Sequence, residues 1–278
     1  MMAEPTILTV DDYVKLPAVA ATARYAYGAD PAQFGDLYVP AQGEQHPVIV
    51  LIHGGCWRAQ YGLTQLGRFC ETFAALGVAV WSLEYRRLGN GGGWPHTFFD
   101  VAAGADYLRT LAPQQALDLS RVIAVGHSAG GHLALWLAAR HKLPATSPLA
   151  TTTPLSLTGV VALAGIPDLV DAEERNICRG AVPDLMGGTA AAMPDRYRDG
   201  SPSAYLPLGI PQHLIIGTLD QAVPVAHNET YVAAAHRQGD DVQFTVLPAP
   251  GHFEIVTPGT TVWPTVQEAI LTLIHRRH

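Results

Sequence analysis

The fold of this chain is decided by residues 121–130, Arg-Val-Ile-Ala-Val-Gly-His-Ser-Ala-Gly, where an apolar run meets a glycine–serine turn. The apolar half is rich in β-branched residues and predicts a buried strand. The stretch that follows, 130–141, predicts a helix. Gly126 and Gly130 leave room for neighbouring backbone, so a tight turn here would expose the Ser128 hydroxyl above the end of a sheet. This strand, turn and helix predict that Ser128 is a nucleophile.

Short apolar runs alternate with helix-length amphipathic segments along the rest of the chain. This alternation is typical of parallel βαβ units, and strands with few polar residues suit a sheet covered on both faces. We therefore expect an α/β fold with a mostly parallel central sheet and helices on both faces, in one domain over residues 1–278. The expected strands cover residues 35–39, 47–52, 78–84, 121–125, 159–164, 213–216 and 242–247, and the expected helices cover 63–75, 97–111, 130–141, 224–238 and 265–276.

Residues 166–211 interrupt this alternation with several prolines, glycines and mixed charges. One short helix is expected near residues 169–178. A long insertion in a compact domain is either an irregular connection or a functional lid. Because the segment lies between the strand that precedes Ser128 and a later strand that ends near an acid, we expect a small cap insertion over the active site.

Two residues downstream of Ser128 have the types and positions of catalytic partners. A serine hydroxyl needs a base to take its proton, and the base needs a third group to orient it. Asp220 and His252 each follow an expected strand, in the order that this strand–turn–helix arrangement uses. We predict that Ser128 is the nucleophile, His252 the general base and then acid, and Asp220 the orienting carboxylate. The structural alternatives are a tight-turn serine, a helix-capping aspartate and a solvated histidine.

A glycine-rich loop, His-Gly-Gly-Cys-Trp at residues 53–57, follows the early strand 47–52. Paired glycines let backbone approach a substrate closely, and inward-facing N–H groups bind the negative charge of a tetrahedral intermediate. We predict oxyanion-hole donors from Gly55, Cys56 and Ala129. Cys56 is rejected as a nucleophile because no base lies near it in the sequence.

These motifs together carry a resemblance. With HGGxW at 53–57, GHSAG at 126–130, and Asp220 and His252 in order, the chain resembles the kynurenine formamidase and esterase/lipase branch of the α/β-hydrolase superfamily. The resemblance extends from about residue 25 to the C-terminus. It implies hydrolysis of an ester or an N-formyl aryl amide through an acyl-enzyme, with no metal or other cofactor. Some esterase relatives show HGGG, and the replacement of the third glycine by Cys56 moves this chain toward arylformamidase-like enzymes.

Three functions from two classes follow from these residues. The first is a carboxylesterase acting on short or aromatic acyl esters. The second is an arylformamidase acting on N-formylkynurenine or a similar anilide. The third is a non-catalytic binding module on a hydrolase scaffold, which the intact order of Ser, Asp and His disfavours. Trp57, Trp94 and Phe253 are expected to contact the substrate, since aromatic side chains near such motifs often line pockets.

Composition excludes several other classes of protein. The net charge of −7 and the absence of a lysine- or arginine-rich block argue against nucleic acid or an anionic membrane as a partner. No apolar stretch approaches the roughly 18 residues needed to cross a bilayer, and the first residues do not resemble a signal peptide. The three cysteines are few and widely spaced, which predicts neither a disulfide framework nor a zinc site. We therefore expect a cytoplasmic enzyme whose partner is a small-molecule ester or amide, and the sequence assigns no oligomeric state.

Overall fold

The computed structural model describes residues 7–276, and its centre is one eight-stranded sheet with the strand order β1-β2-β4-β3-β5-β6-β7-β8. β2 pairs antiparallel with β1 and with β4, and all the other neighbouring strands pair in parallel. The strands are β1 (Ala23–Ala26), β2 (Phe34–Tyr38), β3 (His46–Ile52), β4 (Ala79–Leu83), β5 (Leu117–His127), β6 (Gly159–Leu163), β7 (Gln212–Gly217) and β8 (Val242–Leu247).

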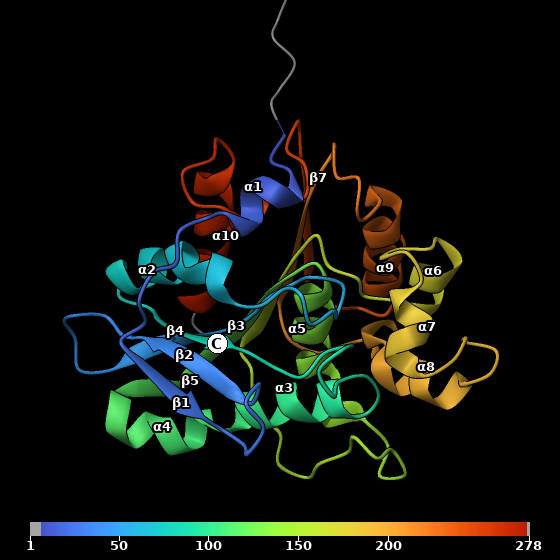
Figure 1. Ribbon diagram of the computed structural model, residues 1–278, viewed down its shortest axis with the longest axis horizontal. Helices are drawn as coiled ribbons and strands as arrows, with labels where there is room; N and C mark the ends of the chain where they lie inside the picture. The colour runs from blue at the N-terminus through green and yellow to red at the C-terminus, as the bar shows by residue number, and fades with distance from the viewer. Residues whose placement is uncertain (1–6, 277–278) are drawn as a thin grey trace, which may run out of the picture.

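Helices cover both faces of this sheet (Figure 1). On one face, Trp263 of α10 packs edge-on against Phe69 and Phe73 of α2. On the other, Phe98 of α3 packs against Trp136 of α5. The helices are α1 (Val10–Val14), α2 (Gly67–Ala75), α3 (His96–Asp106), α4 (Leu108–Gln115), α5 (Ala129–Ala139), α6 (Leu169–Glu174), α7 (Ala181–Met186), α8 (Pro194–Gly200), α9 (Val225–Arg237) and α10 (Trp263–Ile274), and short 3₁₀ turns lie at Thr64–Leu66, Arg140–Lys142, Pro202–Tyr205 and Glu254–Val256.

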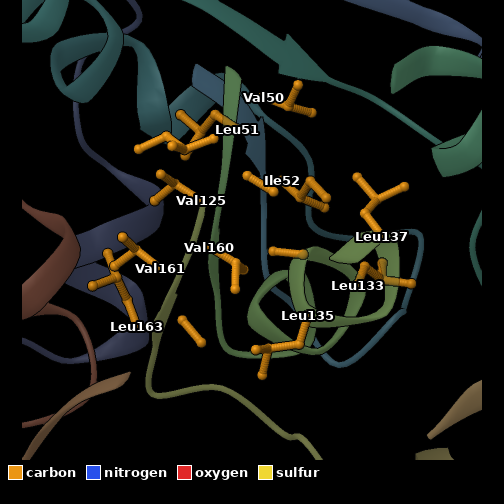
Figure 2. Packing of buried hydrophobic residues seen from close by; sticks show 14 of the residues in the cluster. Val50, Leu51, Ile52, Val125, Leu133, Leu135, Leu137, Val160, Val161 and Leu163 are labelled. Atoms are coloured by element: carbon orange, nitrogen blue, oxygen red, sulfur yellow. The ribbon is translucent and has the colours of Figure 1, made fainter. Parts of the chain in front are cut away.

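The core is built around β3, β5, β6 and α5. Every residue of β3, of β6 and of α5 is buried. Figure 2 shows Leu133 and Leu137 of α5 beside side chains of the central strands, such as Ile52 and Val160. Each fully buried leucine or valine contributes about 1.5–3 kcal/mol to folding. This packing fixes α5, and therefore the turn in front of it, against the middle of the sheet.

The predicted fold class is confirmed, and the differences concern short elements and ends. β5 begins at Leu117, four residues before the predicted start at Arg121. The helix predicted over 97–111 is two helices, which meet at Tyr107. β1 and α1 were not predicted, because four and five residues with mixed exposure are too short for a periodic pattern.

The segment 166–211 contains three short helices, α6, α7 and α8, which lie beside α9 in Figure 1. The short helix predicted near residues 169–178 corresponds to α6. His132 of α5 donates to the Gly200 carbonyl at 2.8 Å, and Trp136 donates to the Asp199 carbonyl at 3.0 Å. The segment is thus attached to the helix that follows Ser128.

Two of the three cysteines form a disulfide, although their number and spacing predicted no disulfide framework. Cys56, after β3, is bonded to Cys178, in the turn between α6 and α7, with 5.5 Å between the Cα atoms. The pair is 122 residues apart in sequence, a separation at which spacing alone indicates nothing. Disulfides persist mainly in oxidising compartments, so the cysteine count no longer supports a cytoplasmic location. Between residues 7 and 276, no helix is both long enough and apolar enough to cross a bilayer.

Candidate active site

Ser128 lies at the turn between β5 and α5 in an unusual backbone conformation, with φ 57° and ψ −123°. Two flanking glycines make this turn possible. A Cβ atom at Gly126 would lie 2.0 Å from the Gly130 carbonyl oxygen, and one at Gly130 would lie 2.0 Å from the Ile52 carbonyl oxygen. The Ser128 N–H donates to the Leu163 carbonyl of β6 at 2.8 Å. The neighbouring strands therefore hold Ser128 in a strained position, as the sequence predicted from its glycines.

Asp220 and His252 are brought together by the loops after β7 and β8. The His252 Nδ1–H donates to Asp220 Oδ2 at 2.7 Å. The other carboxylate oxygen accepts the N–H groups of Ala222 and Val223, each at 2.8 Å. Burial raises the pKa of Asp220, but the hydrogen bond and charge of His252 and the two backbone donors outweigh it and hold this pKa below its usual value. The carboxylate is therefore ionised, and its hydrogen bond to Nδ1 orients the His252 ring.

Ser128 and His252 line the same cavity, which has a volume of about 130 Å³. Its wall also contains the predicted donors Gly55 and Cys56 and the predicted contact Phe253. The cavity thus gathers the carboxyl ends of β3, β5 and β8 into one place. This edge is where ligands bind in parallel α/β sheets.

His127, next to Ser128, links the turn to the loop of the base. Its Nε2–H donates to the His252 carbonyl at 2.9 Å, and the two imidazole rings lie 4.5 Å apart. Burial and the nearby charge of His252 lower the pKa of His127 to about 3. The ring is therefore neutral, and the hydrogen bond assigns its proton to Nε2. No sequence pattern singles out His127 as a residue that supports the site.

The loop after β3 places backbone N–H groups beside Ser128. Three consecutive residues have positive φ: Gly55 (112°), Cys56 (51°) and Trp57 (54°). Within the described part of the chain, no hydrogen-bond acceptor is found for the N–H groups of Gly55 and Cys56. The N–H of Ala129 is the first of α5, where helices leave their donors unpaired. Such donors are suited to bind an oxyanion.

A buried charged cluster supports this loop from behind. His53 Nε2 lies 3.0 Å from Glu84 Oε1, and the Arg87 guanidinium forms an ion pair with the same carboxylate oxygen at 2.8 Å. Tyr85 donates its hydroxyl proton to the His53 carbonyl at 2.8 Å. Burial raises the pKa of Glu84, but His53, Arg87 and the Tyr85 N–H hold it below its usual value. The sequence signal for this cluster is the run of charged and polar residues at 84–87 that follows the mostly apolar strand β4.

Two of the three predicted substrate contacts, Trp57 and Trp94, do not line this cavity. Trp57 is fully buried and packs edge-on against His132, so it belongs to the core. The ring of Trp94 packs against Phe98, and the backbone N–H of Trp94 donates to the Leu185 carbonyl at 2.7 Å. Neither lines the cavity. An aromatic residue near a motif in sequence is more often core than binding site, because most large apolar side chains are buried.

The cavity wall includes α1, which the sequence did not suggest. Val10 and Tyr13 of α1 line it, and Tyr13 stacks on Phe253 with 4.8 Å between ring centroids and 21° between ring planes. Among the described residues that line the cavity, none comes from 166–211. In this structure α1 contributes to the cavity wall, and the predicted cap segment contributes none of its described lining residues.

A mostly parallel sheet whose β5 leads through G-x-S-x-G into a buried helix, with Asp220 after β7 and His252 after β8, defines an α/β-hydrolase. The family follows from a comparison with known families. The chain belongs to the BD-FAE family of α/β-hydrolase esterases, whose model matches residues 35–234.

Solved structures share this fold. A truncated form of a carbohydrate esterase from gut microbiota is similar with a TM-score of 0.80 and 20% identity, covering 94% of this chain and 100% of that one. Esterase B from Lactobacillus rhamnosis, solved with a C6-C4 SN3 inhibitor, is similar with a TM-score of 0.78 and 22% identity, covering 94% and 89%.

A curated relative matches only locally. The non-reducing polyketide synthase ausA of Aspergillus calidoustus is 31% identical over 164 residues, which is 51% of this chain. The match spans only 6% of that synthase.

Proposed function

We propose that this protein is a serine hydrolase that cleaves carboxylic esters through an acyl-enzyme. The observation that carries the proposal is the 2.7 Å hydrogen bond between His252 and the buried Asp220, on a cavity that His252 shares with Ser128. Membership of a family of esterases supports ester hydrolysis as the reaction class. Ser128, His252 and Asp220 have different roles in the proposed triad, so substitution of each residue should change turnover in a different way.

The proposed reaction uses each group in turn. His252 takes the proton of the Ser128 hydroxyl, and the oxygen attacks the carbonyl carbon of the ester. The oxyanion that forms faces the N–H groups of Gly55, Cys56 and Ala129. His252 then gives its proton to the departing alcohol, and water activated by the same imidazole releases the acid. Asp220 stays ionised throughout and stabilises the imidazolium.

The size of the cavity supports a short acyl group. Its volume of about 130 Å³ is well below the roughly 300–1,000 Å³ of pockets that hold drug-sized molecules. An acetyl to butyryl group fits this space against Val10, Tyr13 and Phe253. An aromatic acyl group would have to extend through the opening.

Arylformamidase activity is the second candidate. A formyl group is smaller than acetyl, so the same cavity accepts it, and the HGGxW pattern at residues 53–57 favours this reaction. The leaving group distinguishes the candidates, since an aniline must be protonated by His252 as it departs.

Steady-state kinetics on p-nitrophenyl acetate, methyl ferulate and N-formylkynurenine test these alternatives, with Ser128→Ala as the control. We expect the acetate to have the highest kcat/KM and the alanine variant to lose nearly all turnover. A preference for N-formylkynurenine would assign the enzyme to the arylformamidases. A preference for methyl ferulate would contradict the short acyl pocket. Failure of Ser128→Ala to reduce turnover would refute the nucleophile, and absence of turnover on all three would favour a binding module.

A further inference from the structure

The loop that bears the proposed oxyanion donors has a backbone that is unfavourable without external support. Cys56 and Trp57 both have φ in the left-handed region, which L-residues other than glycine, asparagine and aspartate rarely adopt. The N–H of Cys56 can face the proposed position of the oxyanion only while the loop keeps this conformation. Something outside the loop must therefore hold Cys56 in place.

Contacts of the neighbouring residues hold the two ends of the loop. Trp57 is fully buried, and its carbonyl accepts the Leu88 N–H at 2.8 Å. Gly54 lies so close to the turn between β5 and α5 that a Cβ atom at Gly54 would be 2.7 Å from the His127 carbonyl oxygen. Between them, the side chain of Cys56 is restrained by its covalent bond to Cys178.

Cys178 is attached to the fold mainly through the residue before it. It follows Ile177, which is 3% exposed, and the exposed residues Arg179 and Gly180 separate it from the buried start of α7. The Ile177 N–H donates to the Ala172 carbonyl of α6 at 2.9 Å. The same segment is bound to α5 through the Gly200 and Asp199 carbonyls described above. The disulfide thus closes a connection from the oxyanion loop through the segment 166–211 to the helix behind Ser128.

We propose that Cys178 is a positioning residue for catalysis, which acts through the disulfide to hold the Cys56 amide toward the oxyanion. The inference rests on the proposed function, because it assigns a purpose to the oxyanion loop of that reaction. It also gives the segment 166–211 a role at the site although none of its residues lines the cavity. Both cysteines are half-buried, so a small dithiol can reach the bond.

The test compares the oxidised protein, the protein reduced by dithiothreitol, and the Cys178→Ser variant. In the reduction, the Cys56–Cys178 bond breaks to two thiols while the dithiol closes to its own disulfide, so two electrons and two protons pass to the protein. Kinetics on p-nitrophenyl acetate are measured for each form, together with the affinity for an alkyl boronic acid, which mimics the tetrahedral intermediate on Ser128. Cys70→Ala, at the buried free cysteine, is the matched control for the effect of the reductant.

We expect kcat to fall about 10- to 100-fold on reduction and in Cys178→Ser, because a displaced oxyanion donor costs that much or more. The KM should stay within about twofold, and the boronic acid should lose affinity by the same factor as kcat. Reoxidation should restore the reduced wild type, which keeps the test valid even if Cys178→Ser folds poorly. Cys70→Ala should respond to the reductant as the wild type does.

A purely structural disulfide gives a different pattern. In that case the melting temperature falls on reduction, while kcat and the boronic acid affinity of the folded protein are unchanged, and the proposal is overturned. If the oxidised wild type shows no Ser128-dependent turnover, the proposed function is refuted, and the inference that rests on it is refuted as well. The two failures are therefore distinguishable.

Discussion

Replacement of His127 by leucine should lower the rate of catalysis by displacing the loop that carries His252. The three proposed catalytic residues themselves are unchanged. Leucine removes the Nε2–H that donates to the His252 carbonyl at 2.9 Å. A buried carbonyl left without a donor costs about 1–3 kcal/mol, so the free energy of unfolding should fall by about that amount at pH 7. The His252 backbone then loses its direct hydrogen bond to the serine turn.

The catalytic effect follows from the same bond. A displacement of the imidazole by about 1 Å costs on the order of 10²-fold in rate. Since Asp220 still holds the Nδ1 side of the ring, we expect a loss of about 10- to 100-fold in kcat/KM, or about 1.4–2.7 kcal/mol of transition-state stabilisation.

His127→Gln is the matched control for this effect, because the glutamine amide nitrogen falls near the place of Nε2 and keeps the donor. The assay is kcat/KM on p-nitrophenyl acetate with urea unfolding of each variant in parallel. Glutamine should recover most of the activity lost in the leucine variant. Equal activity of the leucine and glutamine variants would refute the assignment of this hydrogen bond as the link between turn and base.

Three further predictions concern the acid, the buried histidines and the turn. Asp220→Asn should lower kcat by about 10⁴-fold with the fold retained, because an amide cannot hold the required tautomer of His252. Single-turnover kinetics would measure this loss, and a loss below tenfold would contradict the role of Asp220 as the orienting carboxylate. His127 and His132 have pKa values lowered to about 3 and about 4, so the unfolded chain binds protons that the folded one does not. The free energy of unfolding should therefore fall as pH drops below about 6.5, by about 2 kcal/mol per histidine at pH 5, and urea unfolding at pH 7 and pH 5 would detect it; equal stability at both would disprove the shifts. Gly130→Ala places a Cβ atom 2.0 Å from the Ile52 carbonyl oxygen, so the variant should lose several kcal/mol or fail to fold, and a melting temperature near that of the wild type would contradict this packing.

The sequence was sufficient for seven of the eight strands and for the elements around Ser128, because these have strong local signals. Buried parallel strands show as apolar runs, and the G-x-S-x-G pattern marks the turn itself, although the contact that requires Gly130 is with the distant Ile52 carbonyl. Asp220 and His252 follow from strand order, since carboxyl ends of parallel strands meet at one edge.

The missed features depend on contacts between distant residues. Cys56 and Cys178 form a disulfide across 122 residues, and no local pattern marks either as paired. Tyr13 reaches the cavity from a five-residue helix whose position depends on Phe253 at the other end of the chain. Trp57 shows a different difficulty. Gly55 and Cys56, directly before it in the sequence, line the cavity, while the side chain of Trp57 is buried in the core.

The position of α1 has a consequence for how selectivity can diversify. Val10 and Tyr13 supply cavity wall, yet α1 has no buried residue and lies outside residues 35–234, which the family model matches. The reactive groups, in contrast, are embedded in the sheet and its turns. A change in α1 can therefore alter the wall of this cavity without altering the residues of the sheet and its turns. Under the proposed function, substrate preference and reaction chemistry then depend on separate parts of the chain.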